Sequence, residues 1–335
     1  MVPGLSNGMR SRAFFVETVR LLGNLALPAG NRGRLPILIF HSVCETPDSW
    51  ERGSILKEDF DTLMEFLAES FSVLSLTEGV QRLEAGGLPA RSVAITFDDG
   101  YLDNVELALP ILLRYGLTAT FFVATGTLDG GMMWNDQVRE AIRRCPNADL
   151  DLNDLGLGVL DLACERTRIA AFQDCIAKLK YLPVDSRDEL VARLVAKADV
   201  VLNERVMMNR GDIDRLSRAG MSIGAHTVSH PILACVDDRL AEEEILEGKQ
   251  ELTRLLGEEV TLFAYPNGVP GKDYLRQHVE MLQRLGFYAA VTTSQGAANC
   301  SSDRYQLPRF TPWDTNPIPF GMRLIMNGRK KPHTV

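Results

Sequence analysis

The sequence predicts an α/β protein, a distorted (β/α)7 barrel that resembles a TIM barrel and carries a mainly helical insertion. Short segments rich in apolar, β-branched and aromatic residues alternate with segments that have apolar residues at helical spacing. Polar residues capable of chemistry follow several of the apolar segments, as they do at the C-terminal face of parallel barrels. The chain has 335 residues, of which 45% are hydrophobic, and this is enough for one large barrel.

Strands and helices are expected to alternate up to residue 124. The apolar runs have no polar face, which is typical of strands buried on both sides of a parallel sheet. Between them, apolar residues recur every three or four positions, and glycines such as Gly116 end the helices. The expected strands span residues 35–41, 71–76, 92–97 and 118–124, and the expected helices span residues 59–69, 77–83 and 105–115.

The alternation stops between about residues 128 and 210 and then resumes. The interrupting stretch has clear helical patterns over residues 134–144 and 187–198, and we interpret it as an insertion into the barrel. Beyond it, the expected strands span residues 221–225, 260–264, 287–292 and 306–310, and the expected helices span residues 212–219, 238–257 and 274–285. The helix that includes residues 241–251 is strongly charged, and we interpret its charges as a solvated face.

The chain therefore divides into three parts. Residues 1–34 are an N-terminal extension, and residues 35–322 are the barrel domain with its insertion at about 128–210. Residues 323–335 are a C-terminal tail, in which residues 329–333 are expected to be disordered. Within the extension, residues 21–27 could form a short helix at a membrane surface. This segment is far below the roughly 20 residues of a spanning helix, so we expect no transmembrane segment, and weak peripheral contact with a membrane stays open.

Net charge limits the class of partner, and the N-terminal sequence limits the compartment, that we expect for this protein. The net charge of −8 and the pI near 5.3 argue against a nucleic-acid partner. The apolar N-terminal stretch is interrupted by Glu17 and Arg20 before it reaches signal-peptide length, so we expect a cytoplasmic protein. Periplasmic or cell-surface association stays open, and the sequence does not predict an oligomeric state.

Two aspartates and two histidines stand where strands are expected to end. A lone His-x-x-x-His pair or an Asp-Asp-Gly turn is often only structural. However, adjacent Asp98 and Asp99 are costly to bury at the end of a core strand without a cation. With His226 and His230, one of these carboxylates completes a three-ligand metal set, and the other is left to accept a proton from water. Zinc is the default ion, and iron, cobalt, manganese or nickel also suit these ligands.

Three segments resemble the motifs of the polysaccharide deacetylases, the NodB-homology family or carbohydrate esterase family four. The sequence Thr-Phe-Asp-Asp-Gly-Tyr at residues 96–101 and the sequence His-Thr-Val-Ser-His at residues 226–230 resemble the first two motifs. The sequence Phe-Ala-Tyr-Pro-Asn-Gly at residues 263–268 resembles the third. Motif order and spacing agree over roughly residues 35–313, apart from the insertion.

The resemblance implies a role for each of these residues. Asp99, His226 and His230 are the metal ligands, and Asp98 is the general base. The third motif lines the substrate groove, and the backbone N–H of its asparagine stabilises the oxyanion. The alternative for the third motif is a Pro-Asn-Gly turn without a catalytic role. The residues expected in this oxyanion and substrate-binding segment are Tyr265, Pro266, Asn267 and Gly268.

Two departures from the family pattern leave roles to be reassigned. Ala264 stands where the third motif usually has an arginine that steadies the base, and no late histidine is evident. His41 lies in a segment that resembles the N-terminal strand motif of biofilm exopolysaccharide deacetylases. The motif order of those enzymes is circularly shifted. We therefore expect His41 to be the general acid. Arg309 is the candidate for the missing arginine. The alternatives are that His41 is a structural histidine at a strand end and that Arg309 is an ordinary surface arginine.

Tyr101, Trp134 and Trp313 are candidates for stacking on sugar rings, although core packing is the simpler role for at least one of them. Taken together, we expect a metal-dependent N-deacetylase that releases acetate from an N-acetylated sugar in a polysaccharide or glycan precursor. Such an enzyme is a hydrolase of carbon–nitrogen bonds other than peptide bonds. The alternatives are a hydrolase of a small non-sugar amide or imide and an inactive carbohydrate-binding protein. The intact Asp98, Asp99, His226 and His230 set argues against an inactive protein.

Overall fold

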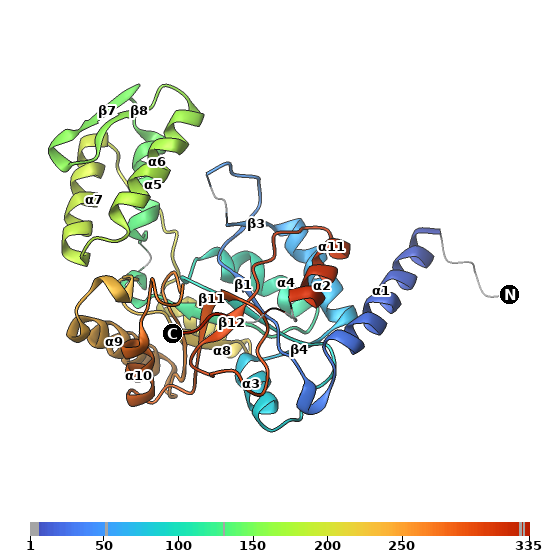
Figure 1. Ribbon diagram of the computed structural model, residues 1–335. Coiled ribbons are helices and arrows are strands. Elements are labelled where there is room, and N and C mark those ends of the chain that lie inside the picture. Colours follow the sequence, from blue (N-terminus) through green and yellow to red (C-terminus); the bar gives the residue numbers. More distant parts are fainter. Residues whose placement is uncertain (1–6, 51–52, 130, 328–329, 331) are drawn as a thin grey trace.

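The computed structural model describes residues 7–50, 53–129, 131–327, 330 and 332–335. Seven parallel strands form a nearly closed barrel surrounded by helices (Figure 1). An eighth strand, β4 (Ser72–Leu74), pairs with the first half of β5. In their order around the barrel, the seven are β1 (Ile37–Phe40), β5 (Ser92–Phe97), β6 (Thr120–Val123), β9 (Ser222–Ala225), β10 (Leu262–Ala264), β11 (Ala289–Gln295) and β12 (Leu307–Arg309).

The last strand returns to the first one. Phe310, directly after β12, donates its N–H to the carbonyl of Ile37 at 2.7 Å and accepts from the N–H of Ile39 at 3.1 Å. The (β/α)7 barrel with a mainly helical insertion is therefore confirmed. All eight strands expected from the sequence are present, each within three residues of its expected ends. Fully buried parallel strands are continuous apolar runs, which is why the pattern located them well.

The helices of the barrel also follow the expected order. They are α2 (Lys57–Ser70), α3 (Leu76–Glu84), α4 (Leu109–Arg114), α8 (Arg210–Arg218), α9 (Asp238–Leu256) and α10 (Arg276–Arg284). The helix expected over residues 105–115 is split, because a wide π-helical turn (Asn104–Ala108) precedes α4. Pro110 has no N–H to donate to the preceding turn, so a regular α-helix cannot run through this point.

The insertion is a separate small lobe with its own hydrophobic core (Figure 1, upper left). It consists of α5 (Trp134–Arg144), α6 (Glu165–Leu179), α7 (Val184–Ala198) and a hairpin of β7 (Asp149–Leu152) and β8 (Gly158–Asp161). The helical character was expected, but the hairpin was not. In β7, side chains alternate between exposed and buried, a period of two that belongs to a half-buried strand.

Both ends of the chain contribute helices that pack on the barrel. Helix α1 (Asn7–Ala26) lies against α11 (Pro317–Asn327) and α2 (Figure 1). The expected boundary at residue 322 is wrong, because it falls inside α11. The segment expected to be disordered, residues 329–333, is held where it is described, since the N–H of His333 donates to the Ser294 hydroxyl at 2.8 Å. Residues 1–6 of the expected extension lie outside the described residues.

In the part of the chain that the structure describes, no helix is both long and apolar enough to cross a bilayer.

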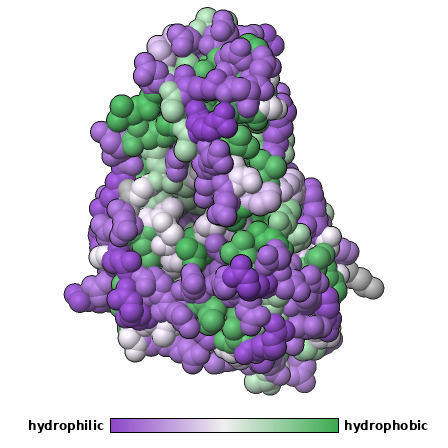
Figure 2. Space-filling view, turned by 90° about the vertical axis from the view of Figure 1, so that its left-hand side faces the viewer, coloured by the Kyte–Doolittle hydropathy of each residue, from purple (hydrophilic) through white to green (hydrophobic). Residues whose placement is uncertain are grey.

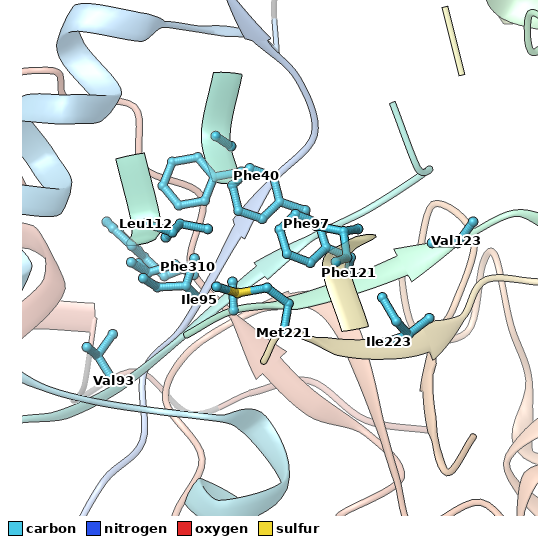
Figure 3. Close-up of a cluster of buried hydrophobic side chains, with 14 of the residues drawn as sticks. Phe40, Val93, Ile95, Phe97, Leu112, Phe121, Val123, Met221, Ile223 and Phe310 are labelled. Carbon is cyan, nitrogen blue, oxygen red and sulfur yellow. The ribbon is translucent and has the colours of Figure 1, made fainter. Parts of the chain in front are cut away.

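A row of phenylalanines packs between the sheet and the helices. Phe40, Phe97 and Phe121 are register partners on three neighbouring strands, and their ring centroids are 5.4 and 4.8 Å apart (Figure 3). The ring of Phe60 on α2 meets Phe40 edge-on, so this row faces outward. Because side chains alternate along a strand, the next residue after Phe97 is directed to the barrel interior. That residue is Asp98.

Candidate active site

Three predicted metal ligands meet at the C-terminal ends of β5 and β9. The Nε2 atoms of His226 and His230 are 3.1 Å apart, and each is 3.4 Å from Oδ1 of Asp99. Ligand atoms that share one divalent cation at about 2.1 Å lie about 3.0 to 3.4 Å apart. The triangle therefore fits a metal ion without rearrangement. Among the described residues, it is the one group of His, Cys, Asp and Glu side chains with this property.

The hydrogen bonds and surroundings of the two imidazoles favour binding of a cation between them. Nδ1 of His226 donates to the carbonyl of Ala264 at 2.7 Å, which leaves Nε2 with its lone pair directed at the other ligands. Burial, together with His226, lowers the pKa of His230 to about 4, so the His230 ring is neutral near pH 7. Burial disfavours a charged His226, but Asp99 and Asp98 together outweigh this effect and raise the pKa of His226. The three groups thus jointly attract one positive charge.

The loop between the two histidines is held by a buried carboxylate. Glu244 on α9 accepts hydrogen bonds at 2.8 Å from the N–H groups of Val228 and Ser229, and at 2.6 Å from the Ser229 hydroxyl. Interpreting this part of α9 as a solvated face was wrong for Glu244, which is buried. A signal for its burial exists in the sequence, because it shares a helix face with apolar and small residues. Those residues are Ala241, Ile245, Gly248 and Leu252.

Backbone strain is concentrated in this region. Asp99, Thr227, His230 and Asn267 have φ angles of 75°, 64°, 55° and 58°, in the left-handed region that side chains with a Cβ rarely adopt. They are four of the six non-glycine residues with positive φ among the described residues. Each such conformation costs roughly 1 to 3 kcal/mol and persists where the surrounding structure enforces it. The strain identifies these loops as a site that is held in a fixed geometry.

Asp98 is paired with Arg309 inside the barrel. The guanidinium donates two parallel hydrogen bonds, Nη1 to Oδ1 at 2.7 Å and Nη2 to Oδ2 at 2.6 Å, and its Nε donates to the Thr292 carbonyl at 2.9 Å. Burial alone would raise the pKa of Asp98, but Arg309 outweighs burial and holds this pKa below its ordinary value. The idea of an ordinary surface arginine is wrong, because Arg309 is fully buried. Asp98 is therefore an ionised acceptor at neutral pH.

His41 lies beside the two aspartates. It directly follows β1, and the N–H of Asp98 donates to the carbonyl of the preceding residue, Phe40, at 3.0 Å. The His41 carbonyl accepts from Nδ2 of Asn104 at 2.7 Å, which fixes the chain at this point. Because Phe40 is the register partner of Phe97, His41 stands next to Asp98 at the C-terminal ends of β1 and β5.

The third motif is divided between the core and the surface. Asn267 is exposed, and its N–H donates no hydrogen bond to any described residue, so it is free to bind a ligand. Pro266 and Gly268 are buried. The expectation that Tyr265 lines a groove is wrong, because its ring stacks on Tyr274 with centroids 3.9 Å apart and is 1% exposed. Only Asn267 in this motif is presented outward.

The three aromatic candidates differ in their surroundings. Tyr101 is not available for stacking, because it is buried against Met133 and Met207 with its hydroxyl 3.3 Å from Asp136. Trp313 is exposed, in the loop between β12 and α11. Trp134 lines a cavity of about 240 Å³ that also reaches His230.

This cavity lies between the barrel and the insertion, where the surface is hollowed (Figure 2). The sequence interpretation missed one of its residues, Arg187 of α7. Its Nη2 donates to the Ser229 carbonyl at 3.2 Å, and its guanidinium lies 5.1 Å from the Trp134 ring centroid. No local pattern marked Arg187, since it is one arginine in a charged helix. The insertion thus contacts the loop that carries His230.

Comparisons with known proteins identify relatives of this chain. The family model for polysaccharide deacetylase matches residues 85–150 and 193–290. The protein YxkH of Bacillus subtilis (strain 168) is 21% identical over 278 residues, which are 82% of this chain and 70% of YxkH. The two matched segments include Asp98, Asp99, His226 and His230, and the gap between them lies in the insertion.

Two solved structures share the fold. The deacetylase PplD of Streptococcus pyogenes, in complex with acetate, has a TM-score of 0.57 and 21% identity, with 84% of this chain and 92% of PplD covered. IcaB from Ammonifex degensii has a TM-score of 0.56 and 18% identity, with 90% of this chain and 98% of IcaB covered.

Proposed function

Since the chain belongs to the polysaccharide deacetylase family, we propose that it removes the acetyl group from an N-acetylated sugar in a metal-dependent reaction. As a member, it is a carbohydrate deacetylase, a hydrolase of carbon–nitrogen bonds. The observation that carries the proposal is the pairing of two features. An ionised carboxylate, Asp98, is held beside the triangle of Asp99, His226 and His230.

These residues would divide the chemistry as follows. A divalent ion held by Asp99, His226 and His230, with zinc the first candidate and cobalt, manganese, nickel or iron as alternatives, would supply a Lewis acid that acidifies water and polarises the amide carbonyl. Asp98 would accept the proton of the attacking water, because both of its oxygens keep a free lone pair beside the Arg309 hydrogen bonds. Arg309 keeps this base ionised and fixes its orientation.

Two further groups would complete the reaction. The free N–H of Asn267 would donate to the oxyanion as the carbonyl becomes tetrahedral. His41 would give a proton to the nitrogen as the C–N bond breaks, so that acetate and a free amine leave. The cavity lined by Trp134 and Arg187 provides space for a part of the substrate next to His230.

The proposal is tested by measuring acetate release from N-acetylated oligosaccharides and from an O-acetylated oligosaccharide, and by measuring ring opening of a small cyclic imide. We expect one new amine per acetate from the N-acetylated substrates, loss of activity after chelation, and recovery when zinc or cobalt is added. Preference for the ester or the imide would overturn the proposed substrate class. Undiminished activity after complete metal removal would overturn the metal dependence.

Replacing His41 by alanine is expected to lower kcat for a sugar acetamide by about 10² to 10⁴ because the leaving nitrogen needs a proton. The same variant should lose much less activity towards an activated aryl acetate, because its leaving group needs no proton. His333→Ala, which changes an exposed histidine, is the control and should match the wild type. Equal losses on the amide and the aryl ester would show that His41 is not the general acid.

A further inference from the structure

An exposed apolar surface covers the outer faces of two adjacent terminal helices, α1 and α11. These helices lie on the flank of the barrel away from the insertion (Figure 1). They carry six of the eleven large hydrophobic side chains that are exposed among the described residues, and Leu25 reaches 82% exposure. We call this surface the α1–α11 patch. Its members are Leu21, Leu22, Leu25, Ile318, Met322 and Met326.

The patch is not needed to hold α11 in place. The inner face of α11 is already packed, with the ring of Phe320 6.1 Å from Phe66 on α2. Gly321 allows this close approach, since a Cβ there would meet the Phe66 ring at 2.8 Å. The large apolar residues of α11 that are exposed instead recur every four positions along its opposite face, at Ile318, Met322 and Met326.

Helix α1 has the same two-sided character. Val19 and Leu27 are buried in the main core of the barrel, whereas Leu21, Leu22 and Leu25 are directed to solvent. Apolar residues on the outer faces of two helices that are already anchored point to a partner, because isolated soluble domains rarely gather their exposed apolar residues in one place.

Charge indicates the chemistry of that partner. Residues 1–34 contain five arginines and one glutamate, a net charge of +4, and residues 313–335 contain four cationic residues and one aspartate, a net charge of +3. The whole chain has a net charge of −8, so the 278 residues between these segments carry −15. The apolar patch therefore belongs to the two cationic segments of an otherwise acidic protein. An apolar helix face within a cationic segment of the chain suits an anionic bilayer.

We propose that the α1–α11 patch docks the protein on the surface of a bilayer that contains anionic lipid, with both helices lying at the level of the headgroups. This inference goes beyond the deacetylase activity and does not depend on it. A second copy of the chain fits less well, because a twofold interface would bring each cationic segment against its own equivalent. The acidic remainder of the surface would face away from the lipid, where repulsion by the headgroups is screened.

The test measures co-sedimentation of the full chain with vesicles of phosphatidylcholine alone or mixed equally with phosphatidylglycerol. We expect binding to the anionic vesicles, weak binding to the neutral ones, and weaker binding at high salt. The triple variant Leu25→Ser/Ile318→Ser/Met326→Ser should lower the partition coefficient by about tenfold or more, because it removes apolar contacts with the interface. Its deacetylase activity on a soluble oligosaccharide should remain unchanged.

A matched control comes from the insertion. Val159 and Val201 are 59% and 78% exposed but lie outside the patch, so Val159→Ser/Val201→Ser should bind vesicles like the wild type. Equal binding by the triple variant and the wild type, or equal binding to neutral and anionic vesicles, would overturn the proposal. So would a wild-type dimer that binds no vesicles and becomes a monomer in the triple variant, because the patch would then be an interface between copies.

Discussion

Replacing Asp98 by asparagine is expected to lower kcat/KM for acetate release by about 10² to 10⁴, because the variant cannot accept the proton of the attacking water. The change leaves the shape of the side chain and Asp99, His226 and His230 unaltered, so metal binding should persist. Acetate release gives the activity, and elemental analysis after dialysis gives the bound zinc per chain. Circular dichroism checks that the variant is folded.

The control for metal binding is His230→Ala, which removes one corner of the triangle of ligand atoms. This variant should lose most of its bound zinc as well as its activity, whereas Asp98→Asn should lose activity alone. The opposite result, with zinc lost from Asp98→Asn, would mean that the two neighbouring aspartates have exchanged the roles we propose for them.

Replacing Arg309 by methionine is expected to lower the free energy of unfolding by about 3 to 5 kcal/mol at neutral pH, the usual cost of leaving one member of a buried ion pair without its partner. Asp98 and Arg309 are both buried and share two hydrogen bonds, so no water can replace the guanidinium easily. Urea unfolding followed by circular dichroism measures this change. Activity should fall as well, because the carboxylate loses its orientation.

The destabilisation should depend on pH in a defined direction. In the wild type, Arg309 holds the pKa of Asp98 below its ordinary value despite burial, so the pair stabilises the fold above about pH 4 and loses this effect as the pH falls through the lowered pKa. Without Arg309, burial raises the pKa of Asp98, and its charge destabilises the fold at neutral pH. The difference between wild type and variant should therefore shrink from pH 7 towards about pH 4.

Arg82→Met is a suitable control for this series. Arg82 pairs with Glu78 one helical turn away at 2.8 Å, and both side chains are more than two-fifths exposed. Loss of such a pair costs about 0 to 1 kcal/mol, with little dependence on pH in this range. A loss of stability in Arg309→Met no larger than in Arg82→Met would contradict the interpretation of the buried pair.

The barrel could be predicted from the sequence because its strands are short apolar runs separated by amphipathic helices. The hairpin of β7 and β8 was missed for a physical reason, since a four-residue strand with two polar positions also resembles a loop. Helix α11 was missed because Pro317 and Pro319 stand in its first turn, where prolines are tolerated but look like loop residues.

Site residues could be predicted where a short sequence motif contains them, and less well where their role depends on contacts with distant parts of the chain. The spacing of His226 and His230 and the doublet of Asp98 and Asp99 are visible in the sequence. The burial of Tyr101 is not, because residues of the insertion far along the chain cover it. The buried role of Glu244 is likewise visible only once α9 is packed against the histidine loop.

The pairing of Asp98 with Arg309 also bears on how the enzyme is made. Their hydrogen bonds join residues 211 positions apart, so a chain emerging from the ribosome displays the aspartate long before its partner has been translated. Contacts at such sequence separation form late in folding, because a long loop must close first. With the role that we propose for Asp98, catalytic activity would therefore be acquired only in the last stage of folding, and a nascent or prematurely terminated chain would be inactive.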